Sequence, residues 1–349
     1  MGIITILGAG AMGSGLCTPL RQSGWEVRLW GTWLDDHLID ACEAGKPHPR
    51  TKVLLAEGVK LYRSAQLQEA LSGADVVVLS VASGGVPKVL EMALDGISKA
   101  KALWLTSKGF CADENGKIQL LPDAIRNIAK QKNVTIPPIV AVAGPVKANE
   151  CAEGKPTATI FGCKDINVSI QYAREARTEV YCVEATDDEI GVEICAPMKN
   201  VYAIALGIAD GLEESTGFPH HNLKAATFNQ AVKEMSLLGQ ALGAKPETAF
   251  GLPGVGDLEV TGLSGRNKVY GVRIGKGETA KEALAEMDRL EQTVEGVPAA
   301  GLAEKLVEQS APQLKDKLTL LKAVIQILNG DINKPVVKVL SEAVLPPKP

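Results

Sequence analysis

The sequence predicts an α/β protein, with an N-terminal Rossmann-type doubly wound sheet over residues 1–189 and an all-helical C-terminal domain over residues 190–349. Two observations support this fold class. Short apolar segments typical of strands alternate with amphipathic segments in the first half, whereas only helical periodicity remains after about residue 190. The chain has 349 residues, which exceeds the usual size of a single hydrophobic core, so two domains are expected.

Composition and charge exclude several classes of function. The 37 Lys and Arg residues are balanced by 41 Asp and Glu residues without a long basic run, so we expect no nucleic-acid partner. No apolar run approaches the roughly 20 residues of a membrane span, and the N-terminus lacks the basic start of a signal peptide. The seven cysteines are scattered and form no CxxC pair, which predicts reduced thiols in a cytoplasmic protein and no metal site.

The N-terminal segment carries a dinucleotide-binding pattern. An apolar strand at residues 3–7 is followed by Gly8-x-Gly10-x-x-Gly13 and then by a helical pattern. In this setting Gly8 makes a tight turn, Gly10 lets the backbone approach a pyrophosphate, and Gly13 lets the helix pack on its strand. The helix start offers free N–H groups to the phosphates. We therefore predict cofactor binding at Gly8, Gly10, Ala11, Met12 and Gly13; the alternative is a plain strand–helix turn.

The strands that follow are those of a doubly wound sheet. Residues 26–30 form the second strand, and the near-continuous apolar runs at 74–81 and 102–109 are typical of parallel strands covered on both faces. Further strands are expected at 138–145, 157–162 and 179–185.

The end of the second strand bears on the choice between NAD and NADP. An acidic residue there would bind the ribose hydroxyls of NAD, but the chain has Trp-Gly-Thr32 at this point, and Asp35 and Asp36 come late. Arg50 offers a partner for a 2′-phosphate, so the sequence favours NADP modestly over NAD. In the alternative interpretation, Thr32 and Arg50 are ordinary loop residues.

Three other strand ends carry candidate site residues, because ligands of open α/β sheets lie outside the carboxyl ends of the strands. The small residues around Ser83 leave room for a cofactor ring, and Lys108 follows a buried strand directly. Gly144 forms a Gly-Pro turn before a helix start near Ala148. The alternatives are a flexible loop and a solvated lysine.

The helical half is expected to contain helices at 191–212, 222–243, 279–290, 296–310 and 316–329. The first of these is apolar on nearly all sides, yet it contains Lys199. Burying an unpaired ammonium is costly, so a carboxylate partner is expected, and Asp257 is one candidate. Burial also lowers the pKa of a lysine, which suits Lys199 to proton donation; the alternative is a lysine that reaches solvent along its stem.

A glycine-rich stretch at 250–277 supplies further polar groups. Arg266 and Asn267 precede a helix expected to start near Lys268, and a guanidinium beside free helical amides binds anions. Asp257 and Thr261 belong to the same stretch. The alternative is a structural loop with an exposed arginine.

Taken together, these segments resemble the NAD(P)-dependent sn-glycerol-3-phosphate dehydrogenases over about residues 3–330. The shared motifs are "GAGAMG" (8–13), "SKG" (107–109), "GPVKANE" (144–150), "EICAPMKNVYAIALGIADGL" (193–212), "GLPGVGDLEVTGLSGRN" (251–267) and "VEGVPAA" (294–300). The resemblance implies reversible hydride transfer between NAD(P)H and dihydroxyacetone phosphate, and a cytoplasmic homodimer.

The resemblance also implies residue roles. Lys199 is the expected acid/base, with Lys108 and Asp257 as further catalytic residues. The small phosphorylated substrate would contact Asn200, Thr261, Arg266, Asn267 and Gly144. The resemblance places Arg266 and Glu295 near the cofactor; the strand-end patterns described above add the glycine-rich turn, Thr32, Arg50, Ser83, Lys108 and Ala148 as cofactor contacts.

Two departures from the family pattern keep alternatives open. Bacterial members often have arginine where this chain has Thr32, and the segment 214–222 with His220 and His221 replaces a glycine-rich lead into the next helix. A dehydrogenase acting on another keto phosphate, such as a four-carbon one, is therefore a second hypothesis. A non-catalytic nicotinamide-nucleotide sensor is a third.

Overall fold

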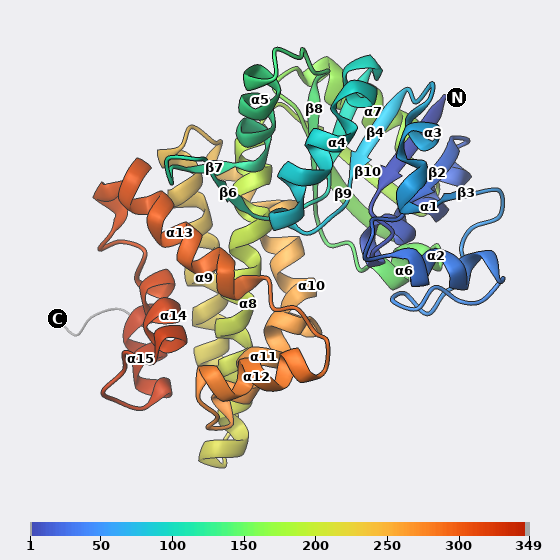
Figure 1. Ribbon diagram of the computed structural model, residues 1–349. Coiled ribbons are helices and arrows are strands. Elements are labelled where there is room, and N and C mark those ends of the chain that lie inside the picture. Colours follow the sequence, from blue (N-terminus) through green and yellow to red (C-terminus); the bar gives the residue numbers. More distant parts are fainter. Residues whose placement is uncertain (1, 346–349) are drawn as a thin grey trace. The chain divides into compact units, whose positions relative to one another are not determined.

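The computed structural model describes residues 2–345 and divides into two compact units (Figure 1). The first unit comprises Met1–Cys111 and Leu120–Val192, and the second comprises Ala112–Gln119 and Glu193–Pro349. An α/β unit followed by a helical one confirms the predicted fold class. The short segment 112–119 belongs to the second unit although it lies within the first in sequence.

The first unit is built on an eight-stranded sheet in the order β10-β9-β8-β5-β4-β1-β2-β3. Strand β9 pairs antiparallel with β8, and the other neighbours pair in parallel. The strands are β1 (Ile3–Leu7), β2 (Glu26–Trp30), β3 (Lys60–Tyr62), β4 (Val76–Leu79), β5 (Ala102–Leu105), β8 (Ile139–Ala143), β9 (Thr157–Gly162) and β10 (Tyr181–Thr186). The strand order reverses between β1 and β4, because the chain builds β2 and β3 on one side of β1 and the later strands on the other; such a switch point is where doubly wound sheets bind ligands.

Alternate side chains of the central strands enter two different cores. Ile4 and Ile6 of β1 lie on one face with Trp104 of β5, whereas Leu7 and Leu103 lie on the other. The first face is covered by α1 (Ala11–Gln22), α6 (Ala148–Ala152) and α7 (Ile166–Ala176), and the second by α3 (Leu67–Leu71), α4 (Val86–Lys99) and α5 (Leu121–Gln131). Covering both faces explains the unbroken apolar runs in the sequence.

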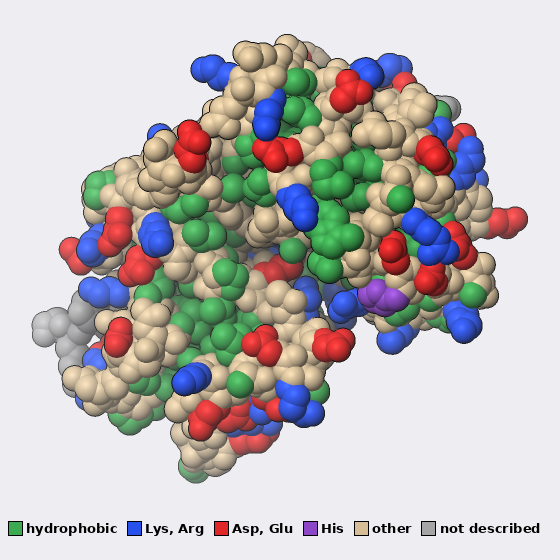
Figure 2. Space-filling model, viewed as in Figure 1, with side chains coloured by type: hydrophobic (Ala, Val, Ile, Leu, Met, Phe, Trp, Pro, Cys, Tyr) green, Lys and Arg blue, Asp and Glu red, His purple; other side chains and the backbone are tan. Residues whose placement is uncertain are grey.

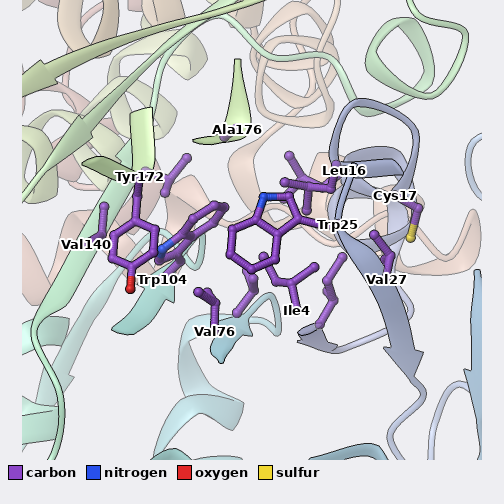
Figure 3. Packing of buried hydrophobic residues seen from close by; sticks show 14 of the residues in the cluster. Ile4, Leu16, Cys17, Trp25, Val27, Val76, Trp104, Val140, Tyr172 and Ala176 are labelled. Atoms are coloured by element: carbon purple, nitrogen blue, oxygen red, sulfur yellow. The ribbon is translucent and has the colours of Figure 1, made fainter. Parts of the chain in front are cut away.

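Aromatic rings pack against one another among the aliphatic side chains of the first core (Figure 3). Trp104 contacts Trp25 edge to face at 6.4 Å between ring centroids, and it contacts Tyr172 of α7 in the same way at 5.6 Å. Such pairs add to the free energy gained by burial and fix the helix on the sheet. The carboxyl ends of the strands are thereby held on a rigid scaffold.

Short elements account for the differences between the predicted and observed secondary structure. Strand β3 at the sheet edge and the hairpin β6 (Phe110–Ala112)–β7 (Ile118–Leu120) have three residues per strand, too few to show a period. The run at 102–109 ends as a strand at Leu105, so that Lys108 lies in a loop. Helix α11 (Arg266–Gly275) begins at Arg266 rather than near Lys268.

The second unit is helical apart from its share of the small hairpin. Its helices are α8 (Glu189–Thr216), in which the chain division falls, α9 (His221–Ala241), α10 (Asp257–Leu263), α11, α12 (Ala280–Arg289), α13 (Gly296–Ser310), α14 (Thr319–Asn329) and α15 (Val336–Val344). Helix α8 is long and apolar enough to cross a membrane by length and composition, but its most apolar window is wholly buried in the protein. It is the core helix of this unit.

A buried carboxylate joins three helices of this unit. Glu234 of α9 is fully buried and accepts hydrogen bonds from the Tyr202 hydroxyl of α8 at 2.9 Å and from the backbone N–H groups of Leu320 and Leu321 at 2.6 and 2.9 Å. It therefore caps the N-terminus of α14 from a neighbouring helix. Burial raises the pKa of Glu234, although these hydrogen bonds act in the opposite direction.

Candidate active site

The glycine-rich turn of the first unit has the geometry that a dinucleotide requires. Gly8 has φ +116°, and a Cβ there would lie 2.6 Å from the carbonyl oxygen of Ser80. A Cβ on Gly13 would lie 2.0 Å from the carbonyl oxygen of Gly8, so α1 can pack on its strand only with glycine at this position. A Cβ on Gly10 would meet no atom within 4 Å, which leaves open space beside the turn.

The start of α1 is suited to an anion. Its N-cap, Gly10, has no side chain that could cap the helix, and no acidic residue stands in the first turn from Ala11. The first amide groups of a helix lack intrahelical partners and attract negative charge. The turn therefore fits the pyrophosphate of NAD or NADP, as the sequence predicts.

The loops after β4 and β5 are held together beside this turn. Ser107 donates a hydrogen bond to the carbonyl oxygen of Val81 at 2.7 Å, and Thr106 donates one to Ser80 at 3.0 Å. A Cβ on Gly109 would lie 2.3 Å from Cβ of Ser83, so the two loops pack closely. The candidate residues Ser83 and Lys108 thus come from neighbouring loops at the carboxyl ends of two central strands.

Lys108 and Gly144 line the same small cavity. Gly144 has φ +142°, and a Cβ there would lie 2.9 Å from Cα of Thr159, so glycine is required at this turn. Met12 of α1 lines the cavity as well. Ala148 of α6 packs against the helix α1, since a Cβ on Gly15 would lie 2.6 Å from its carbonyl oxygen.

Asp35 lies at the end of β2 in space, although its position in the sequence suggests that it comes too late to do so. Asp35 folds back over a turn in which its N–H donates to the carbonyl oxygen of Thr32 at 2.9 Å. One carboxylate oxygen of Asp35 accepts hydrogen bonds from the N–H and hydroxyl of Thr32 at 3.0 and 2.8 Å and from the N–H of Ala9 at 3.4 Å. Asp35 thus lies beside the glycine-rich turn, and protein donors already occupy this oxygen.

In the second unit, the buried lysine has the carboxylate partner that its burial demands. Nζ of Lys199 lies 2.9 Å from the Asp257 carboxylate and donates a hydrogen bond of 2.6 Å to Oγ1 of Thr261. The side chains of Lys199 and Asp257 are 8% and 2% exposed, so the interpretation in which the lysine extends into solvent is wrong. Asp257 begins α10, which places its carboxylate and Thr261 one turn apart on the same helix face.

A second polar network adjoins this cluster through Asn200, the residue after Lys199. Asn200 donates to Glu295 at 3.2 Å and accepts from Asn267 at 3.0 Å, and Asn267 in turn accepts from the N–H of Gly296 at 2.8 Å. The guanidinium of Arg266 lies 3.6 Å from Glu295 and is 48% exposed. Arg266 therefore presents a positive charge at the uncapped start of α11, where the helical amides also favour an anion.

Glycines bring α8 and α11 into backbone contact, a feature that the sequence analysis did not predict. A Cβ on Gly271 of α11 would lie 2.0 Å from the carbonyl oxygen of Ile204 on α8, and one on Gly207 of α8 would lie 2.2 Å from that of Lys268. Gly211 and Gly275 make the same reciprocal contact one turn further along. The Gly-x-x-x-Gly spacing in both helices was the available signal, and it places Asn267 against Asn200.

Part of the variant segment 214–222 lines a cavity of the second unit. Pro219, His220, His221 and Asn222 line a separate cavity of about 500 Å³ with residues of α15. Lys199, Asp257 and Arg266 do not line this cavity.

The comparisons with known proteins agree with this geometry. Models of the N- and C-terminal parts of NAD-dependent glycerol-3-phosphate dehydrogenase match residues 3–169 and 188–338. An NADP(+)-dependent glycerol-3-phosphate dehydrogenase of Archaeoglobus fulgidus is 36% identical over 93% of this chain and 95% of its own length. A glycerol-3-phosphate dehydrogenase [NAD(P)+] of Fusobacterium nucleatum is 29% identical over 94% and 97%.

A solved structure shows the same architecture. The crystal structure of a glycerol-3-phosphate dehydrogenase from Coxiella burnetii superimposes with a TM-score of 0.82, at 27% identity, and covers 99% of both chains. Both halves of the chain therefore match one family of NAD(P)-dependent oxidoreductases. The chain belongs to the NAD-dependent glycerol-3-phosphate dehydrogenase family.

Proposed function

We propose that this chain interconverts dihydroxyacetone phosphate and sn-glycerol 3-phosphate, with Lys199 as the proton donor. The observation that carries the proposal is the buried ammonium of Lys199, held by Asp257 and Thr261 within a family of dehydrogenases. When bound, NADH or NADPH would supply the hydride that C2 of the substrate accepts. Nζ of Lys199 gives a proton to the carbonyl oxygen as its negative charge develops, and in the reverse direction takes the hydroxyl proton.

The neighbours of Lys199 would fix its position. Asp257 and Thr261 restrict the ammonium to one geometry, which reduces the reorganisation required in the transition state. Lys108, on the loop beside Gly144, would bind the substrate oxygen or the substrate itself. Asn200 and Gly144 would contribute further substrate contacts.

The substrate phosphate would lie at the start of α11. Arg266 carries an exposed guanidinium there, and Asn267 is the next residue of the helix. Glu295 holds both Arg266 and Asn200, so it would orient the phosphate clamp and lie near the cofactor. Binding energy from this remote phosphate would position the reacting carbonyl.

We expect Arg266→Ala to raise the KM for dihydroxyacetone phosphate by about 10- to 100-fold, because a charged hydrogen bond of about 1.5–3 kcal/mol is lost. Arg273→Ala in the same helix is the matched control, since Arg273 pairs with Glu278 and has no proposed role in the site. Steady-state kinetics with varied substrate measure the effect. An unchanged KM in the Arg266 variant would remove Arg266 from phosphate binding.

The cofactor preference is proposed to favour NADP over NAD. The carboxylate oxygen of Asp35 that faces the glycine-rich turn is already engaged by Thr32 and Ala9, which makes it a poor partner for ribose hydroxyls. Arg50 is exposed on a loop attached to that turn and can meet a 2′-phosphate. The A. fulgidus relative is NADP(+)-dependent.

Arg50→Ala is therefore expected to raise the KM for NADPH about tenfold or more while changing the KM for NADH little, since only NADPH carries the 2′-phosphate. Lys46→Ala, which removes another exposed positive charge from the same loop, is the control. Initial rates measured in parallel with both cofactors test this. Equal changes for NADH and NADPH would show that Arg50 does not read the 2′-phosphate.

The choice of substrate is tested by comparing keto phosphates side by side. The four-carbon alternative rested on the variant segment 214–222, but that segment lines a cavity that Lys199 does not reach. We therefore expect kcat/KM to be highest for dihydroxyacetone phosphate. A higher value for a four-carbon keto phosphate would establish the alternative, and cofactor binding without any turnover would establish the sensor hypothesis.

A cytoplasmic homodimer remains our prediction for the assembly and location of the protein. The seven cysteines all have free thiols, which agrees with a reducing compartment. On the face shown in Figure 2, basic and acidic side chains are interspersed rather than clustered into patches of like charge. Light scattering of the purified protein measures the oligomeric state.

A further inference from the structure

A buried histidine holds the glycine-rich turn of the first unit. His48 is 1% exposed, and its Nε2 lies 2.9 Å from the carbonyl oxygen of Ala9, between Gly8 and Gly10. Its Nδ1 accepts hydrogen bonds from the N–H groups of Arg50 and Thr51 at 3.2 and 3.3 Å. These two donors require a lone pair on Nδ1, so the proton of the neutral ring is on Nε2 and is donated to Ala9.

The loop that carries Arg50 is closed around this imidazole. The N–H of His48 donates to the carbonyl oxygen of Val53 at 2.8 Å, and the N–H of Lys52 donates to that of His48 at 2.8 Å. Lys52 adopts φ +64°, a conformation that a lysine rarely takes without support from its surroundings. The position of Arg50 therefore depends on contacts made by His48.

Ala9 is held from two sides. Its carbonyl oxygen contacts His48, and its N–H donates to Asp35 at the end of β2. In doubly wound sheets this end of the second strand is where the adenosine ribose is recognised. The 48–53 loop is thus fastened to the adenosine end of the dinucleotide site.

We propose that His48 is a positioning residue that holds Arg50 at the 2′-phosphate of NADP, and that this arrangement requires the imidazole to be neutral. The proposal rests on the function proposed above, since it assigns a residue to the cofactor site of that reaction. A proton on Nδ1 would point at the N–H groups of Arg50 and Thr51 and would release the loop.

The surroundings of His48 set the pH at which its imidazole becomes protonated. Burial lowers the pKa of His48, the Ala9 carbonyl and Asp35 raise it, and Arg50 and His37 lower it further. Because the pKa lies below the ordinary histidine value of about 6.5, the neutral form persists at neutral pH. The affinity for NADPH should therefore be constant near pH 7 to 8 and fall as the pH drops through the lowered pKa.

The test is calorimetric titration of the full chain with NADPH and with NADH, without substrate. His48→Ala should weaken NADPH binding about 10- to 100-fold and NADH binding much less. A double-mutant cycle with Arg50→Ala should be strongly non-additive, because His48 acts on the 2′-phosphate only by holding the backbone of Arg50. His37→Ala removes an exposed side chain of α2 (Asp36–Glu43); it is the matched control and should bind as the natural protein does at pH 7.5, where His48 is neutral.

A second variant separates positioning from folding. The side-chain oxygen of His48→Asn can accept the N–H groups of Arg50 and Thr51 but does not titrate. It should retain NADPH affinity within a few-fold at pH 7.5. At acid pH its NADPH affinity should fall less than that of the natural chain, because position 48 no longer takes up a proton. The 2′-phosphate itself titrates near pH 6, so the comparison is between variants with the same ligand.

Three results would overturn the proposal: unchanged NADPH affinity in His48→Ala, equal losses for NADH and NADPH, or the same acid fall in His48→Asn as in the natural chain. Failure of the proposed function is distinguishable, because the natural chain would then bind neither nucleotide or would bind them without turnover.

Discussion

Replacing Lys199 by alanine is expected to lower kcat by about 10²- to 10⁴-fold, the usual contribution of a positioned general acid. The reason is that Nζ is the proton donor in the proposed reaction and is held by Asp257 and Thr261. The equilibrium affinity for NADPH should change little, because the predicted cofactor residues of the glycine-rich turn belong to the other unit. Stopped-flow turnover at saturating substrate measures the effect.

The alanine variant removes the ammonium that pairs with the buried Asp257 carboxylate, which alone can cost several kcal/mol of folding stability. Lys199→Arg is therefore the matched variant, since a guanidinium keeps the ion pair but does not release its proton near neutral pH. It should fold normally and remain at least about 100-fold slower than the natural chain. Near-normal turnover in a folded Lys199→Arg protein would show that Lys199 is not the acid.

Gly271→Ala is expected to destabilise the protein by about 3 kcal/mol, at the upper end of the cost of overpacking. The new Cβ would lie 2.0 Å from the carbonyl oxygen of Ile204, and neither backbone can move without separating α8 from α11. Because α11 begins with Arg266 and Asn267, the folded fraction should also bind dihydroxyacetone phosphate more weakly. Chemical denaturation gives the stability, and steady-state kinetics give the KM.

Gly301→Ala is the control for this substitution. Gly301 lies within α13, and a Cβ there would meet no atom within 4 Å. The variant should be unchanged or more stable by up to about 1 kcal/mol, because alanine is the better helix former. Equal stability of the Gly271 and Gly301 variants would contradict the close helix contact.

The parts predicted from the sequence are those that local pattern or charge burial dictates. The glycine-rich turn was predictable because its three glycines have fixed spacing between a strand and a helix. The pairing of Lys199 with a carboxylate was predictable because an apolar helix cannot bury an ammonium alone, and Asp257 meets that demand.

The parts that could not be predicted depend on contacts between segments distant in sequence. Asp35 reaches Ala9 only because the turn after β2 folds back, and His48 reaches Ala9 through a loop with no periodicity. Glu234 looks like any surface glutamate of a helix until α14 is placed over it. The backbone contact between α8 and α11 likewise needs both helices in place before its glycines have a partner.

The proposed reaction is best tested by following the hydride itself. The purified chain is incubated with dihydroxyacetone phosphate and NADPH that carries deuterium at both C4 positions of the nicotinamide, and the product is analysed by mass spectrometry and NMR. We expect sn-glycerol 3-phosphate with one deuterium at C2. Product without deuterium at C2, or bound cofactor that is never oxidised, would contradict it.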